Sequence, residues 1–152
     1  MRTPMPPIAA AAAVAAALLA LPARGEKVDL PPAGLARVAT HIVVDEVRAV
    51  YTRQERVDDW QYTRYLAEVA AKTVEKGEGV PAGALLYVRY WTREWRGGPN
   101  APPSTAGHRG LPRAGDTLRV YLARNAYDGF TNENADGGFN VIGANGFERV
   151  GP

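Results

Sequence analysis

The stretch from Ala84 to Trp95 limits the fold most strongly, because its side chains alternate between two faces with a period of two residues. A strand sends neighbouring side chains to opposite faces, whereas a helix groups residues three and four apart. One face is mainly apolar and the other is aromatic and basic: Leu86, Val88, Tyr90 and Thr92 against Tyr87, Arg89, Trp91, Arg93 and Trp95. The pattern predicts a strand with its apolar face in a core.

Further segments have strand character. The run 37–51 is rich in β-branched residues, and its alternation changes register near Asp45-Glu46, which predicts a long bent strand with a bulge. The segment 117–123 predicts a strand with Leu118, Val120 and Leu122 inward. A short strand is expected at 139–142, and 147–150 closes the chain.

The segments between these strands are less regular. Residues 61–74 fit either a helix or a strand, and the alternation of small and apolar side chains with charged ones favours the strand. Residues 53–60 are polar and predict a turn. The loop 96–115 is long for a compact domain, and loops of that length are commonly functional or mobile. Residues 125–138 form a polar loop.

The N-terminus has the pattern of a secretory signal peptide. Arg2 precedes an apolar run from Ile8 to Leu21, which is too short for a bilayer span, and small residues stand at the cleavage positions before Glu26. We expect residues 1–25 to be the signal, 26–36 an extended lead-in and 37–152 a single domain. The protein is then exported, to a periplasm or to the medium, without a membrane span in the mature chain.

Charge and composition exclude several classes of function. Removal of residues 1–25 takes away two of the 18 basic residues and none of the 16 acidic ones, so the mature chain is neutral and a nucleic-acid partner is not expected. The chain has no cysteine, and therefore hydrophobic packing or a metal must replace disulfides. No phosphate loop, dinucleotide fingerprint or catalytic triad motif is present, and no enzymatic activity is expected.

Five strands with uneven loops predict a small all-β barrel of the oligonucleotide/oligosaccharide-binding (OB) type. Two segments, Val74-Glu75-Lys76-Gly77 and Gly115 to Leu122, resemble the netrin and tissue-inhibitor-of-metalloproteinase class of OB barrels over roughly residues 38–124. Those inhibitors bind a protease zinc through an N-terminal cysteine, which this chain lacks, so their activity does not carry over. The segment from Tyr127 to Phe147 also resembles uncharacterised exported bacterial proteins.

The aromatic and basic face of 84–95 is a candidate ligand surface, because stacked arginines and aromatic rings suit sugars and protein partners. The same residues also fit a cross-strand cation–π ladder that binds no ligand. In the loop 96–115, a histidine exposed beside an arginine suggests a ligand contact or an acid–base group, against a purely structural role. The candidate ligand-binding residues are Tyr87, Arg89, Trp91, Arg93, Trp95, His108 and Arg109.

The segment 132–137 resembles the first half of a calcium loop, with oxygen-bearing side chains at alternate positions followed by a glycine. The residue at the twelfth position is Gly143 instead of a bidentate glutamate, which excludes an EF-hand. A weak calcium site and a polar turn both remain open. The candidate metal ligands are Asp128, Asn132, Asn134, Asp136 and Asn140.

These observations favour an exported, non-enzymatic binding module for a protein or a glycan. The alternative is a structural or envelope-associated protein that a calcium-bound loop stabilises.

Overall fold

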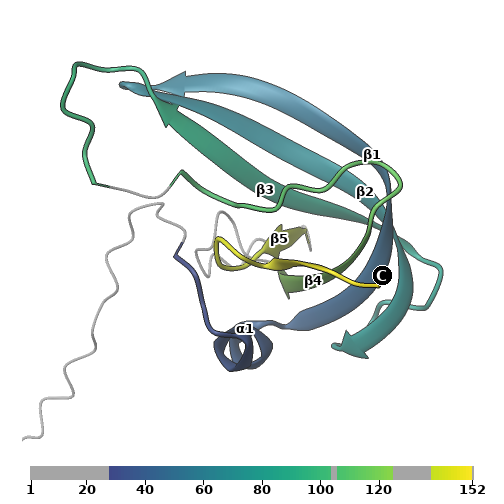
Figure 1. Ribbon diagram of the computed structural model, residues 1–152. Helices are drawn as coiled ribbons and strands as arrows, with labels where there is room; N and C mark the ends of the chain where they lie inside the picture. The colour runs from purple at the N-terminus through teal and green to yellow at the C-terminus, as the bar shows by residue number, and fades with distance from the viewer. Residues whose placement is uncertain (1–27, 104–105, 125–137, 152) are drawn as a thin grey trace, which may run out of the picture.

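The computed structural model describes residues 28–103, 106–124 and 138–151 (Figure 1). Apart from one short helix, the regular elements in these ranges are strands. The elements are α1 (Pro32–Val38), β1 (His41–Val57), β2 (Trp60–Lys76), β3 (Leu85–Trp95), β4 (Thr117–Arg124), β5 (Phe139–Val141) and β6 (Phe147–Arg149). The predicted all-β class is confirmed. None of the helical residues in these ranges forms a segment long and apolar enough to cross a lipid bilayer.

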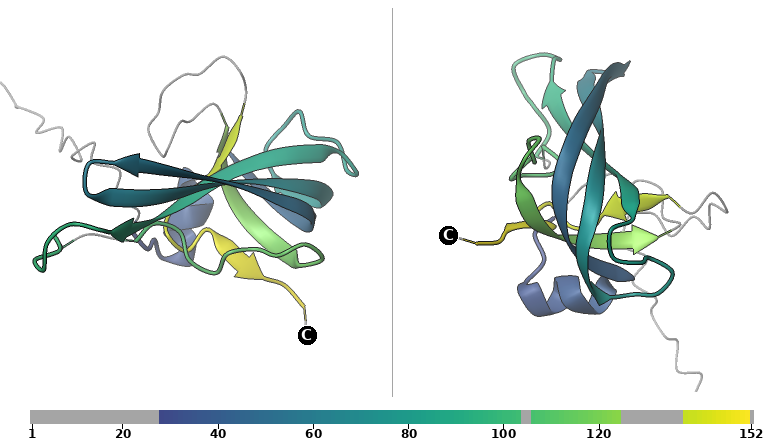
Figure 2. Two further views of the ribbon diagram at one scale, coloured as in Figure 1. Left: turned by 90° about the horizontal axis from the view of Figure 1, so that it is seen from above. Right: turned by 90° about the vertical axis from the view of Figure 1, so that its right-hand side faces the viewer.

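Five of the strands close into a ring. The hydrogen-bonded order is β1-β2-β3-β5-β4, and β4 returns to β1 through six antiparallel residue pairs from His41–Leu122 to Glu46–Thr117. The pairing of β3 with β5 is parallel, whereas the other neighbours run antiparallel. The sixth strand, β6, pairs with residues 118–120 of β4, on the same edge as β5 and opposite β1. Figure 2 shows the long strands crossing over the shorter C-terminal ones.

The inner face of the ring forms the main core, because alternate residues of every strand in it are apolar. Leu118 and Leu122 have no exposed surface and Val120 has 1%. The inward orientation predicted for these residues is therefore confirmed. The same cluster contains buried side chains from the other strands, among them Val43, Val47, Val69, Leu86, Val88 and Val141.

The first two strands are longer than predicted, although the start predicted for β1 at residue 37 is wrong, because the chain is still helical there and β1 begins at His41. Residues 61–74 lie within β2, as favoured, because its small inward residues fit a strand that has partners on both sides. The register shifts on both sides of Asp45-Glu46 confirm the bulge there. The polar turn predicted over 53–60 is wrong, since β1 continues to Val57 and only Asp58 and Asp59 make the turn.

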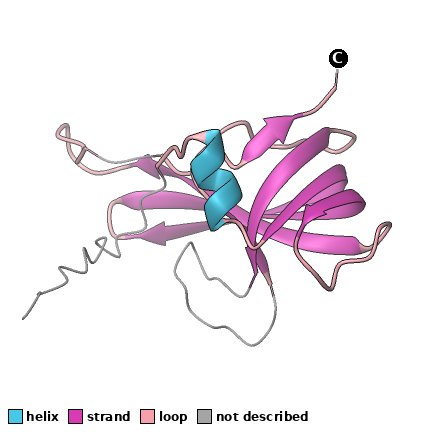
Figure 3. Cartoon of the chain, turned by 90° about the horizontal axis from the view of Figure 1, so that it is seen from below, coloured by secondary structure: helices cyan, strands magenta, loops and turns pink. Residues whose placement is uncertain are grey.

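The lead-in predicted as extended over 26–36 is also wrong in its second part, where α1 begins at Pro32. A proline in the first helical turn costs nothing, because its missing N–H has no partner there anyway. Leu35 is buried and packs with Ile42, Tyr121 and Ile142 in a second, smaller cluster. The helix thus covers the outer side of β1 and β4 (Figure 3).

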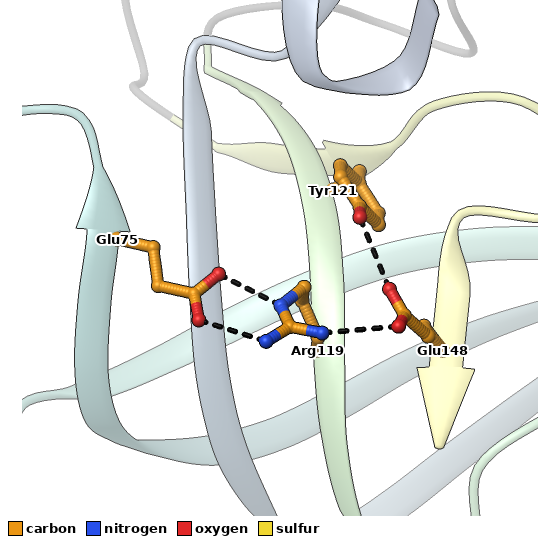
Figure 4. A network of polar contacts seen from close by, with 4 residues as sticks. All are labelled: Glu75, Arg119, Tyr121 and Glu148. Carbon is orange, nitrogen blue, oxygen red and sulfur yellow. Dashed lines mark hydrogen bonds and ion pairs between the residues drawn. The ribbon is translucent and has the colours of Figure 1, made fainter. Parts of the chain in front are cut away.

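A polar network lies on the outer side of the ring. The guanidinium of Arg119 on β4 contacts Glu75 on β2 and Glu148 on β6, and the hydroxyl of Tyr121 donates to the second oxygen of Glu148 at 3.0 Å (Figure 4). The network therefore joins three strands that are distant in the sequence.

Candidate functional site

The most distinctive part of the fold is an arm made of the far halves of β1 and β2 and the end of β3. Within it, Trp60 pairs with Trp95 and Thr63 pairs with Thr92, and Val57 lies opposite Trp60 across the two-residue turn. The arm continues past the short strands of the ring (Figure 1). Because strand residues alternate, it presents two faces of different chemistry.

The first face is aromatic and basic. The Arg93 guanidinium lies 4.2 Å from the centre of the Trp60 ring, and its Nη1 donates a hydrogen bond to the Tyr62 hydroxyl at 3.0 Å. Trp60 contacts Trp95 edge-on at 5.1 Å, and Tyr62 contacts Trp91 at 5.5 Å between ring centres. These groups satisfy one another as a cross-strand cation–π stack.

Two of the predicted ligand residues lie inside the protein. Trp91 is 3% exposed and His108 is 4% exposed, so the expectation of an exposed histidine is wrong. The reason is that residues 106–108 extend the sheet at the edge of β3: Trp91 O accepts a hydrogen bond from His108 N at 2.9 Å, and Ala106 O accepts one from Arg93 N at 2.9 Å. Because residues 106–108 pair with β3, the His108 side chain packs against the core.

The contacts of His108 explain its burial. Its Nε2 lies 2.9 Å from Val141 O on β5, and its Nδ1 lies 3.2 Å from Trp91 N. Nδ1 also lies 3.0 Å from Trp91 O, so the two ring nitrogens contact backbone groups of both β3 and β5. His108 thus connects the end of β3 with β5.

The other predicted ligand residues have accessible surface. The Tyr87 side chain is 50% exposed and Arg89 is exposed beyond it on the same face of β3. Trp95 is half-buried, and its indole N–H donates to Gly98 O at 2.8 Å. Arg109 is exposed and forms an ion pair with Asp29 near the N-terminus of the described chain. The seven candidates therefore do not form one continuous site.

The second face of the arm contains an open polar pocket of about 290 Å³ that sequence reasoning missed. Amide, hydroxyl and charged side chains line it: Gln54, Arg56, Gln61, Thr63, Thr92, Arg93, Glu94 and Arg96. The signal for it was the alternation of aromatic with polar residues over 60–63, which begins inside the segment 53–60 that was predicted to be a turn. Ion pairs of Arg56 with Asp59 at 3.7 Å and of Arg96 with Glu94 at 3.0 Å balance most of its charge.

One carboxylate is buried in the core. Asp45 has no exposed surface and lies between Ala71 on β2 and Leu118 on β4, and neither carboxylate oxygen has a hydrogen-bond partner among the described residues. Burial raises the pKa of Asp45 from 3.8 to about 7, because the charged form loses its hydration. Asp45 is therefore the most perturbed acid in the described chain that could respond to neutral pH.

Most of the predicted calcium ligands, Asp128, Asn132, Asn134 and Asp136, lie outside the described residues. Asn140 is the exception: it is 3% exposed on β5, and its side-chain amide nitrogen has no partner within the described ranges. Among the described residues, no three His, Asp or Glu side chains are grouped closely enough to hold a metal ion. The calcium hypothesis therefore stays a prediction.

Comparison of the chain with protein-family models, with curated proteins and with solved structures found no match.

Proposed function

We propose that this protein is an exported, non-enzymatic module that binds a saccharide in the polar pocket of its arm. The observation that carries the proposal is the composition of the pocket. Gln54, Gln61, Thr63 and Thr92 supply amides and hydroxyls from three adjacent strands, and charged side chains complete its lining. Sugar hydroxyls both donate and accept hydrogen bonds, so such a mixture of groups suits them.

The surroundings of the pocket favour a small polar ligand over a protein surface. The exposed large apolar side chains of the arm, Tyr51 and Val57, are on the opposite face, as is Tyr87. Protein interfaces usually depend on an apolar or aromatic centre, and none of the side chains that line the pocket is apolar or aromatic. The volume of about 290 Å³ is at the lower end of the range for small-molecule sites.

The fold supports the same proposal. We propose that the ring is an OB-like barrel related to the netrin and tissue-inhibitor-of-metalloproteinase class. The closed order β1-β2-β3-β5-β4 supports this assignment. OB folds bind oligosaccharides and oligonucleotides on the face around strands two and three and beside the loop between strands one and two. The pocket lies at the far end of the same two strands, next to the turn at Asp58-Asp59, on the face that continues the inner side of the ring.

The proposed location is outside the cytoplasm, and it rests on the leader pattern of residues 1–25. A periplasmic or secreted protein would meet envelope and extracellular glycans there. The absence of cysteine is compatible with this location, because the two apolar clusters supply the packing that disulfides often provide in small exported domains.

A defined oligosaccharide array, followed by calorimetric titration of the strongest binding sugar, tests the proposal. Gln61→Ala and Thr63→Val should each weaken binding about fivefold, the effect of losing one hydrogen bond of about 1 kcal/mol. Tyr87→Ala, on the opposite face, should leave the affinity unchanged. Binding that Tyr87→Ala abolishes and the pocket variants spare would move the site to the aromatic face. If no sugar on the array binds, the proposal is wrong.

A further inference from the structure

The far half of β1 has a free edge. Its pairing with β4 ends at Glu46, and the backbone of Val47 is bonded to Asp116 O at 2.9 Å and to Gly115 N at 2.8 Å. From residue 48 to 57, the described residues offer β1 only one strand neighbour, β2. In Figure 1 this half of β1 forms the outer border of the arm. A strand edge of this length is a template for another strand.

The direction of the free backbone groups follows from the turn. Val57 and Trp60 close a two-residue hairpin, so Val57 is hydrogen-bonded to β2, and every second residue before it is as well. Thr52, Gln54 and Arg56 therefore direct their backbone N–H and C=O groups away from β2, toward the free edge. Side chains of the residues between them lie on the aromatic face of the arm.

We propose that a second copy of this chain binds this edge, with β1 pairing antiparallel to β1 of its partner about a two-fold axis at Gln54. In this register Arg53 lies opposite Glu55 of the other copy, and the symmetry creates this pair twice. Tyr51, which is 55% exposed, lies opposite Val57, which is 41% exposed. Opposite charges and apolar side chains facing each other across strands both stabilise pairing.

The other symmetric registers along this edge are less complementary. An axis at Arg53 places two arginines face to face, and an axis at Glu55 does the same with two glutamates. An axis at Thr52 sets Arg48 opposite Arg56. An axis at Tyr51 requires Glu55 to pair with Val47, whose backbone is already bonded to residues 115 and 116. Charge complementarity therefore selects the axis at Gln54.

The pairing has a consequence for the polar pocket. Gln54 contributes to the pocket lining, and residues that lie opposite one another in paired strands share a face of the sheet. The pockets of the two copies would lie side by side across the axis. The dimer does not depend on what the pocket binds, so it can be tested without a ligand.

Sedimentation equilibrium of the purified protein gives the first test. The wild type should dimerise as concentration rises. Arg53→Glu alone and Glu55→Arg alone should each weaken self-association at least tenfold, because each variant places like charges opposite one another twice. An equimolar mixture of the two variants should form a heterodimer, since every such pair then has opposite charges. Thermal unfolding of each variant shows that the fold is intact.

A cysteine placed on the axis gives an independent test, because the chain has no other cysteine. Gln54→Cys should cross-link two copies on mild oxidation. Thr52→Cys is the matched control on the same edge, since its two copies would be offset by about 13 Å, well beyond the reach of a disulfide. A monomeric wild type at every concentration overturns the proposal. Equal cross-linking of both cysteine variants, or a mixture no more associated than the single variants, also overturns it.

Discussion

Arg119 on β4 forms a two-pronged ion pair with Glu75 on β2, with Nε 2.7 Å from Oε2 and Nη2 2.9 Å from Oε1. Strand β1 lies between them, because it pairs with β2 on one side and with β4 on the other (Figure 4). The ion pair therefore connects β2 with β4 across the outer side of β1. The hydrogen bond from Arg119 lowers the pKa of the Glu75 carboxyl.

Arg119→Lys should lower the free energy of unfolding by about 1 kcal/mol, because lysine keeps the charge and loses the planar fork. The difference from wild type should shrink in high salt, and also as the pH falls through the lowered pKa of Glu75. Chemical denaturation at several salt concentrations and pH values measures both effects. Arg37→Lys, at the exposed end of α1, is the control and should leave stability unchanged. An equal loss in both variants would contradict a specific role for the ion pair.

Asp45 should make the protein more stable in mild acid than at alkaline pH. Its pKa in the folded state is about 7, above the ordinary value of 3.8, so the cost of burying the charge appears as the pH rises through this window. The free energy of unfolding should fall by roughly 1–3 kcal/mol between pH 5 and pH 8 through this group. Asp45→Asn should remove this part of the pH dependence. A variant with an unchanged pH profile would show that Asp45 does not titrate in this range.

Trp91→Ala should destabilise the fold by about 3–5 kcal/mol, the usual cost of removing a large buried aromatic side chain. Tyr87→Ala, four residues earlier on the same face, should cost less than about 0.5 kcal/mol because half of that side chain is already exposed. Urea denaturation of the two variants makes the comparison. Similar small losses would indicate that Trp91 is accessible in solution, and its role as a ligand contact would regain support.

Gly77 and Gly83 allow a matched test of a close contact. Both have positive φ, at 100° and 84°. A Cβ at Gly77 would lie 2.3 Å from the His41 ring, whereas at Gly83 it would meet nothing within 4 Å. Gly83→Ala should therefore cost about 1 kcal/mol from backbone strain alone.

Gly77→Ala should cost at least about 1 kcal/mol more than Gly83→Ala, because the His41 ring must move. His41 is buried, with its Nε2 2.8 Å from Glu78 O in the same turn, so its movement disturbs that contact as well. Thermal melts compare the two variants. If they melt together, the ring of His41 adapts freely.

Periodicity in the sequence was enough to identify the strands of the core. The alternation in 84–95 and 117–123 predicted which side chains face inward, because a residue on a half-buried strand must match one of two environments. Leu118 and Leu122 are fully buried as expected. The change of register near Asp45-Glu46 predicted the bulge for the same reason.

The same reasoning was wrong where both faces of the chain are polar or half-exposed. Residues 53–57 have the composition of a turn, yet they lie in β1 because β2 pairs with them and Glu55 accepts a hydrogen bond from Arg64 at 2.8 Å. Pairing with a neighbouring strand outweighs local composition there. The proline and glycine content of residues 26–36 likewise suggested an extended lead-in, while packing of Leu35 against β1 and β4 stabilises a helix.

By itself, the sequence determined the all-β class and the inward faces of the strands, because local alternation reports burial directly. Only the tertiary structure decided which polar residues are exposed. Contacts between segments far apart in the chain bury His108 and assemble the pocket from three strands. Such contacts also bury the Asp45 carboxylate without a hydrogen-bond partner among the described residues. The edge of β1 is free because no further strand among the described residues pairs with it, and a local sequence pattern does not indicate which strands pair.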